Sequence, residues 1–201
     1  MVYRESDVRK KGYTRGWELS LSHEINTGIT AGFCKGTPSS DIIECLRHLK
    51  ACLLEISHPF LLPVIIFSHD ASFKAEIKQR DARDWLRRLE HAISMRPKIE
   101  EKEGYVKGGV VDLDAINRDL VECHAQVLWK RPIAHIRILD SIKEAAEGFY
   151  EKLSENRKTS MNKLHASLLS RLEFYRRKLQ GIDLYADTTL RRIEIQRNAV
   201  R

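Results

Sequence analysis

The chain has 201 residues, of which 42% are hydrophobic and 31% charged, and its formal net charge is +7. This length and composition suit one domain with its own hydrophobic core and exclude a chain that is disordered throughout. The longest apolar run, Phe60 to Phe67, is less than half of the roughly 18 residues that a membrane-spanning helix needs. No apolar segment of a signal peptide follows the charged N-terminus, so the sequence predicts a cytoplasmic location.

Four cysteines lie inside apolar patterns and do not space like a disulfide framework, which fits a reducing compartment. Two of them and one histidine fit either metal ligands or core packing. Cys45, His48 and Cys52 share one face of a predicted helix, where zinc sites are rare, so we expect core packing there.

Residues 1 to 16 are charged and show no clear period, whereas the next segment alternates between apolar and polar residues as strands do. The first strand presents Trp17, Leu19, Leu21 and His23, and the returning strand presents Ile29, Ala31 and Phe33. Asn26-Thr27-Gly28 between them predicts a three-residue turn, in which the glycine supplies a positive φ. We expect this hairpin to pack on helices or to join another strand, because a lone hairpin is marginal in water.

Two helices are predicted after the hairpin. Asp41 and Glu44 have the spacing of a capping box, and the helix that they begin ends at His58-Pro59. The run from Phe60 to Phe67 fits either a buried strand or the start of a helix with Pro63 in its first turn. The pattern favours an extended entry into a helix from Ser72 to Met95. Its expected inward residues are Phe73, Ile77, Trp85, Leu86, Leu89 and Ile93.

A charged, glycine-containing linker from Pro97 to Gly109 divides the chain into predicted regions 1–109 and 110–201, expected to form one cooperative unit. Asp112 or Asp114 caps the next helix, and Pro132 kinks or breaks it. An apolar seam then continues to Leu153. Asn156 to Thr159 form a tight turn or lie within a helix.

From Lys158 to the C-terminus, apolar residues recur at steps of three or four, which is typical of one long amphipathic helix of roughly 60 Å. The segment from Arg157 contains 11 Lys and Arg against 4 Asp and Glu, so it carries the whole net charge. No Gly or Pro follows Ile193, and we therefore expect the far half of this helix to meet a partner or to continue into a larger protein.

The sequence therefore predicts a mainly α fold with a small N-terminal β-hairpin and a C-terminal antiparallel pair of long helices. We call one stripe of the terminal helix the interaction seam and expect it to mediate assembly of a homo-oligomer. The interaction seam consists of Leu168, Leu172, Tyr175, Leu179, Ile182, Leu190 and Ile193.

Catalytic motifs are missing from the sequence, including a phosphate-binding loop, a metalloprotease helix and a nucleophile elbow. We expect a protein that is not an enzyme. An acidic stretch around the linker could bind a cation such as Mg²⁺. An exposed linker and a helix cap would account for the same acidic residues without a metal. The acidic stretch consists of Glu100, Glu101, Glu103, Asp112, Asp114 and Asp119. Trp85 and Trp129 are expected in the core, and the spread of the basic residues disfavours a nucleic-acid partner.

Several short motifs together resemble the cytosolic portion of the fungal CorA-like magnesium-transporter family. They are His58 to Pro63, Gln79-Arg80, Arg87 to Glu90, Arg171 to Tyr175, Leu179, and Thr189-Leu190 followed by Ile193 and Gln196. The resemblance implies a cytosolic domain whose long helix transmits a conformational change to a channel, in an oligomer that is pentameric in the transporters. Magnesium is the regulatory ion that it suggests.

The family's Gly-Met-Asn motif and both transmembrane helices are missing from the 201 residues, so no pore residue carries over. The basic terminal helix would adjoin a membrane segment beyond the chain end or an anionic membrane surface. The alternative hypothesis is a soluble helical scaffold that binds other proteins through the interaction seam and has no transport role.

Overall fold

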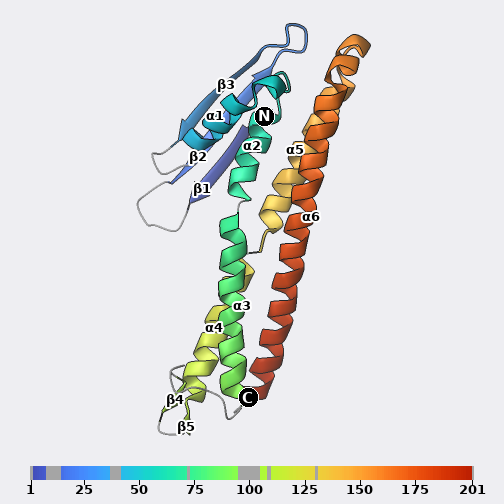
Figure 1. Ribbon diagram of the computed structural model, residues 1–201. Coiled ribbons are helices and arrows are strands. Elements are labelled where there is room, and N and C mark those ends of the chain that lie inside the picture. The colour runs from blue at the N-terminus through green and yellow to red at the C-terminus, as the bar shows by residue number, and fades with distance from the viewer. Residues whose placement is uncertain are drawn as a thin grey trace. The chain divides into compact units, whose positions relative to one another are not determined.

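The computed structural model describes residues 2–7, 15–36, 42–71, 73–94, 105–107, 110–129 and 131–200, and it confirms a mainly α-helical fold (Figure 1). The strands are β1 (Val2–Asp7), β2 (Arg15–His23), β3 (Thr30–Gly36), β4 (Val106–Lys107) and β5 (Val110–Val111). The helices are α1 (Ile42–Ala51), the short 3-10 helix η1 (Leu53–Glu55), α2 (Leu61–Asp70), α3 (Phe73–Ile93), α4 (Leu113–Trp129), α5 (Ile133–Glu151) and α6 (Glu155–Val200).

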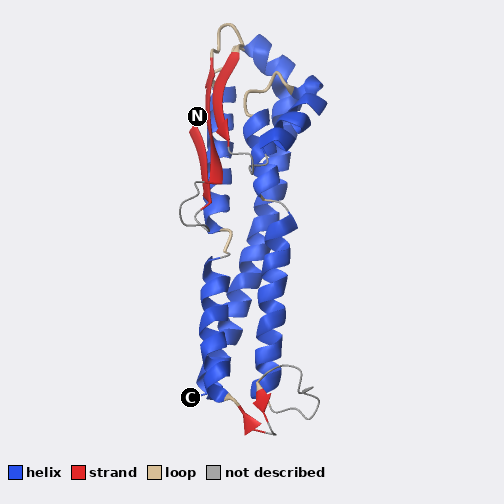
Figure 2. Ribbon diagram, turned by 90° about the vertical axis from the view of Figure 1, so that its left-hand side faces the viewer, coloured by secondary structure: helices blue, strands red, loops and turns tan. Residues whose placement is uncertain are grey.

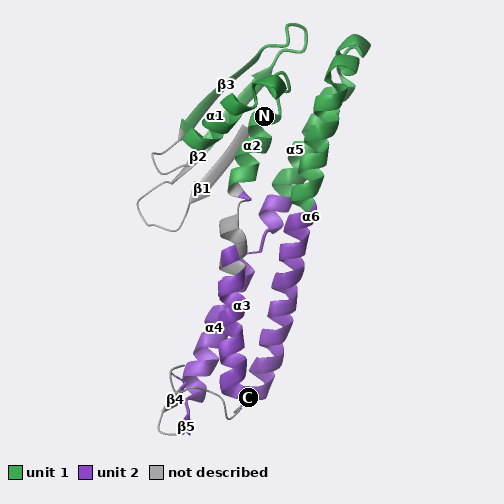
Figure 3. Cartoon of the chain, viewed as in Figure 1, with its two compact units in different colours: residues 1–70, 137–176 green, residues 71–136, 177–201 purple. Residues whose placement is uncertain are grey.

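The chain forms two compact units, and each is assembled from separate stretches of sequence (Figure 3). Unit 1 contains residues 1–70 and 137–176, and unit 2 contains residues 71–136 and 177–201. The boundary predicted at Gly109 falls inside unit 2, because the linker there joins two helices, α3 and α4, that pack on each other. The long helix α6 belongs to both units.

Unit 1 contains a three-stranded antiparallel sheet in the order β1-β2-β3 (Figure 2). The predicted hairpin of β2 and β3 is confirmed, and it joins a further strand as expected. That strand, β1, was not predicted, because Val2–Asp7 is mostly polar and lacks the alternation of a half-buried strand. Charged residues are usual in a strand at the edge of a sheet, where they oppose pairing with another chain.

The turn between β2 and β3 is longer than the predicted three-residue turn. His23 pairs with Thr30, whereas the predicted turn would pair it with Ala31. Gly28 supplies the positive φ as expected, at 77°. Because side chains alternate between the faces of a sheet, a shift of one residue moves the whole returning strand to the other face. Phe33 is therefore 67% exposed instead of packing on the inner side.

The apolar run after His58-Pro59 is helical, so the expected extended entry was wrong. Leu61–Asp70 forms α2, with Pro63 in its first turn, where the missing amide proton costs nothing. Four consecutive residues, from Val64 to Phe67, are all buried. A helix that is covered on every side has no polar face, and its periodicity therefore cannot distinguish it from a buried strand.

Unit 2 is a bundle of α3, α4 and the second part of α6 around one core. Its buried members are Ala82, Leu86, Leu89, Ala92, Ile116, Leu120, Cys123, Val127, Ala186, Leu190 and Ile193. The prediction that Trp129 lies in the core is wrong, because this last residue of α4 is 74% exposed. Trp85 is half-buried, and its Nε1 donates to the Tyr105 hydroxyl at 3.3 Å. Ile77 was also expected to face inward but is 38% exposed.

The helix predicted to end at His58-Pro59 ends earlier, at Ala51, and the 3-10 helix η1 follows it, so that prediction was wrong. Other helix boundaries follow the local signals. Oδ1 of Asp112 accepts a hydrogen bond from the amide of Ala115 at 2.9 Å and so caps α4. Pro132 separates α4 from α5 as predicted, and Asn156 to Thr159 lie within α6. The predicted cap at Asp41, the side chains of Trp17 and Phe73, and the acidic residues Glu100, Glu101 and Glu103 lie outside the described residues.

Two aspartates of α6 form ion pairs of different kinds, and we expect different contributions to stability. Asp183 accepts from both Nε and Nη2 of Arg131 at 2.8 Å, and both side chains are only 25% exposed. Asp187 pairs with Arg191 one turn along the same helix, where the side chains are 41% and 77% exposed.

Asp183→Asn should lower the free energy of unfolding by about 1–3 kcal/mol, because it weakens a bidentate charged contact between elements. The matched variant Asp187→Asn should cost less than about 0.5 kcal/mol, as exposed pairs within one helix do. Urea denaturation of both variants measures the difference, and equal losses would contradict this ranking.

Candidate functional site

The predicted interaction seam lies inside the fold of the single chain. Leu168 and Leu172 are buried in unit 1, and Leu179, Leu190 and Ile193 are buried in unit 2. Tyr175 and Ile182 are half-buried. The Tyr175 ring meets the Phe67 ring edge-on at a centroid distance of 6.0 Å. The structure thus uses these residues to hold α6 within each unit, and a partner could reach them only if the helix left its own cores.

The exposed side of α6 carries apolar residues that the sequence reading did not single out. In unit 2, Leu184, Tyr185 and Ile195 are 70%, 63% and 64% exposed. Arg83 lies over the Tyr185 ring at 5.7 Å from its centroid. Leu184 and Ile195 are eleven residues apart, just over three helical turns at about 3.6 residues per turn, so they lie along one line of the helix. This group of three, which we call the outer α6 patch, is a surface that another chain can reach.

Acidic partners on other elements neutralise part of the basic excess of α6. In unit 1, Arg171 Nη2 lies 2.7 Å from a carboxylate oxygen of Glu55, and Arg176 Nε lies 2.9 Å from one of Asp140. Several arginines of α6 therefore anchor the helix to other elements.

Two buried histidines form the most unusual polar contact of unit 1. His58 and His165 are 2% and 6% exposed, and Nε2 of His58 lies 3.2 Å from Nδ1 of His165. The amide of Phe60 donates to Nδ1 of His58 at 3.2 Å, so the proton of a neutral His58 is on Nε2. His58 therefore donates to His165. The Tyr150 ring stacks on His165 at 4.2 Å between centroids and 6° between planes.

Burial keeps both histidines of this stack uncharged. Burial, together with the smaller effects of the positive charges of His165 and His23, lowers the pKa of His58 to about 4. Burial also lowers the pKa of His165, although the negative charge of Glu147 opposes the change. At pH 7 the pair is a neutral hydrogen-bonded chain, which suits its apolar surroundings.

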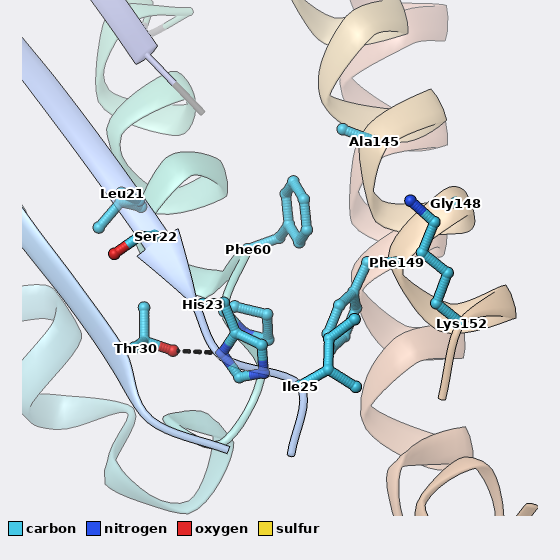
Figure 4. Close-up of a pocket in the computed structure, with 11 residues that line it drawn as sticks. Leu21, Ser22, His23, Ile25, Thr30, Phe60, Ala145, Gly148, Phe149 and Lys152 are labelled. Carbon is cyan, nitrogen blue, oxygen red and sulfur yellow. Dashed lines mark hydrogen bonds between the residues drawn. The ribbon is translucent and has the colours of Figure 1, made fainter. Parts of the chain in front are cut away.

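A cavity of about 400 Å³ lies in unit 1 (Figure 4). Its lining comprises Leu21, Ser22, His23, Ile25, Thr30, Pro59, Phe60, Ala145, Gly148, Phe149 and Lys152. Nδ1 of His23 lies 2.8 Å from the Thr30 hydroxyl, and the His23 ring meets the Phe149 ring edge-on at 5.1 Å. The Phe149 ring also lies 5.7 Å from that of His58, which connects the cavity wall to the histidine stack.

The described part of the chain contains no group of three or more His, Cys, Asp or Glu side chains that could hold a metal ion. Cys45 is buried and Cys52 half-buried, and the exposed ring of His48 lies 5.6 Å from that of His69. None of the described helices is both long enough and apolar enough to cross a membrane.

Comparisons with protein-family models, with curated proteins and with solved structures find no match to this chain. The CorA-like resemblance therefore stays a prediction that rests on the short motifs quoted above.

The buried contact between His58 and His165 leads us to predict that the folded chain loses stability in acid. The pKa of His58 is about 4 in the folded chain and 6.5 in an ordinary histidine, so the unfolded chain binds the proton more tightly. Stability should be highest above pH 6.5 and fall as the pH drops towards 4, with His58 contributing a loss of up to about 3 kcal/mol.

His58→Gln keeps a donor towards His165 but cannot titrate, so its unfolding free energy should change less steeply over this pH window. His91→Gln, at an exposed position of α3, is the control and should keep the wild-type slope. Urea midpoints between pH 4 and pH 7 measure the slopes. A wild-type slope in His58→Gln would rule out this assignment.

Proposed function

We propose that the chain is the cytosolic, oligomer-forming coupling body of a CorA-like divalent-cation transporter, in which α6 transmits a conformational change. The observation that supports this role is the continuity of α6, a single helix of 46 residues that supplies core residues to both compact units. Each residue of such a helix is tied to the next turn by a backbone hydrogen bond. A displacement of the helix in one unit is therefore passed to the other.

Both units hold α6 firmly enough for it to carry such a displacement. In unit 1 the anchors are Arg171 with Glu55 and the buried His165 with His58. In unit 2, Arg192 binds both carboxylate oxygens of Glu90 on α3, with Nε at 2.9 Å from Oε1. Bidentate arginine contacts fix orientation as well as distance, so they are suited to transmitting a movement.

The transport role requires pore helices outside these 201 residues. Sequencing the transcript beyond the codon for Arg201 tests this requirement. Two apolar runs of about 20 residues each, with Gly-Met-Asn between them, are expected. A stop codon directly after Arg201 would contradict a transport role for this protein.

Magnesium is the regulatory ion expected for this role, bound through acidic residues between subunits. A ligand that binds only the folded state raises the thermal midpoint, and the rise grows with the ratio of its concentration to its dissociation constant. Melts in the absence and presence of millimolar MgCl₂, at equal ionic strength with NaCl, should differ by a rise in the midpoint. An unchanged midpoint would count against a regulatory magnesium site.

Assembly is expected through the outer α6 patch, since the interaction seam is occupied within the chain. Leu184→Arg should reduce the mass measured by light scattering at a given concentration, because it places a charge in an apolar contact. The thermal midpoint of the dissociated chain should change little, because Leu184 is exposed. Asn117→Arg, at an exposed position of α4, is the matched control and should leave the mass unchanged. A monomeric wild-type chain would overturn the oligomer proposal.

A second candidate function is a scaffold for other proteins, which a different surface of unit 2 favours. Val121 in the middle of α4 is 52% exposed, and Leu128 and Trp129 at its end are 45% and 74% exposed. Exposed aromatic and aliphatic residues are common at protein interfaces. A stop codon after Arg201 together with a monomeric chain would favour this role over transport.

A further inference from the structure

We propose that the cavity of unit 1 binds a small aromatic monocarboxylate. The site and its ligand do not depend on the transport role, because every residue of the argument belongs to unit 1. The proposal rests on three features of the cavity: its unfilled apolar walls, the charge of its rim and the glycine on its α5 wall.

The walls of the cavity are apolar and aromatic, and within the described part of the chain they stay partly exposed. Ile25, Phe60 and Phe149 are half-buried where they line it. The Phe60 and Phe149 rings are 6.0 Å apart with 48° between their planes, so they pack on each other and form one aromatic wall of the cavity. A volume of about 400 Å³ is near the lower end for small-molecule sites, so it suits a compact ligand rather than a nucleotide.

The polar lining favours an anion. Among the described residues that line the cavity none is acidic, whereas Lys152 contributes an ammonium group and Ser22, His23 and Thr30 contribute hydrogen-bonding groups. Figure 4 shows the Lys152 side chain running back along α5, with its ammonium group beside Gly148. A carboxylate can accept hydrogen bonds from these donors while the ring of the same molecule lies against the aromatic wall.

Gly148 leaves room on the α5 wall of the cavity. A Cβ atom built on it meets nothing within 4 Å, so a larger side chain there would extend into the space that a ligand needs. Gly181, in the unit 2 part of α6, has equally open surroundings but does not line the cavity. Leucine is a better helix former than glycine, so Gly→Leu at either position should preserve its helix. The two glycines are therefore a matched pair for a test.

A ligand in the cavity would also contact a turn that is hydrogen-bonded to α6. Arg157 of α6 donates hydrogen bonds to the backbone carbonyls of Ile25 and Asn26 in the turn after β2. Ile25 is one of the residues that line the cavity. Occupation of the cavity therefore acts on a turn that is tied directly to the first part of α6.

Isothermal calorimetry and amide chemical shifts with 3-phenylpropionate test the proposal on the full chain. We expect saturable binding with shifts confined to the residues that line the cavity. The neutral amide of the same acid should bind about three- to fivefold more weakly, as expected for loss of an exposed ion pair. Lys152→Met should remove this preference for the acid.

Gly148→Leu should abolish binding, while Gly181→Leu should bind the acid as the wild type does. Circular dichroism melts confirm that both variants are folded. Undetectable binding to the wild type, equal binding of the acid and the amide, or full binding by folded Gly148→Leu would each overturn the proposal. The Lys152→Met comparison keeps the test decisive if Gly148→Leu does not fold. None of these results depends on oligomer formation or on magnesium.

Discussion

The continuity of α6 is the constraint on which the rest of the structure depends. One helix with no proline in its 46 residues presents the same apolar stripe to two successive cores. Leu172 is fully buried in unit 1 and Ile193 in unit 2, although they are 21 residues apart. Because one helix supplies core residues to both units, each unit must supply its own covering helices, and the division of the chain into interleaved segments follows.

Features that depend on local sequence could be predicted. The steps of three and four residues in α6, the proline between α4 and α5, and the positive φ of Gly28 each have a local cause that a single sequence displays. Features that depend on the surroundings could not. α2 is buried on all sides, so its sequence shows no polar face, and the strand pairing of β2 with β3 was shifted because turn length is not encoded by alternation.

The polar contacts of unit 1 could not be predicted from sequence patterns, because they too depend on the surroundings and not on local spacing. His58 and His165 are 107 residues apart, and Arg171 and Glu55 are 116 residues apart. No spacing rule connects such residues. His58 was read as a helix-ending signal, and the charges of the terminal helix were counted as a group rather than paired individually. A histidine beside a proline and an apolar run was the only local hint that an ionisable group enters a core.

The interaction seam shows how one pattern can fit two kinds of packing. Apolar residues at helical spacing predict that a face is covered, but they do not say whether the same chain or another one covers it. Here the same chain covers it, so assembly would need a different surface. The coupling role is unaffected, because it requires a continuous helix that is held along its length, whichever elements hold it.

Hydrogen exchange of the backbone amides of α6 in the intact chain tests this continuity most directly. An unbroken helix packed along its length predicts slow exchange at every residue from Leu168 to Leu190, including those at the division between the units near Arg176. Fast exchange confined to residues 174–180, between two slowly exchanging segments, would show a break in the helix and would contradict the coupling role.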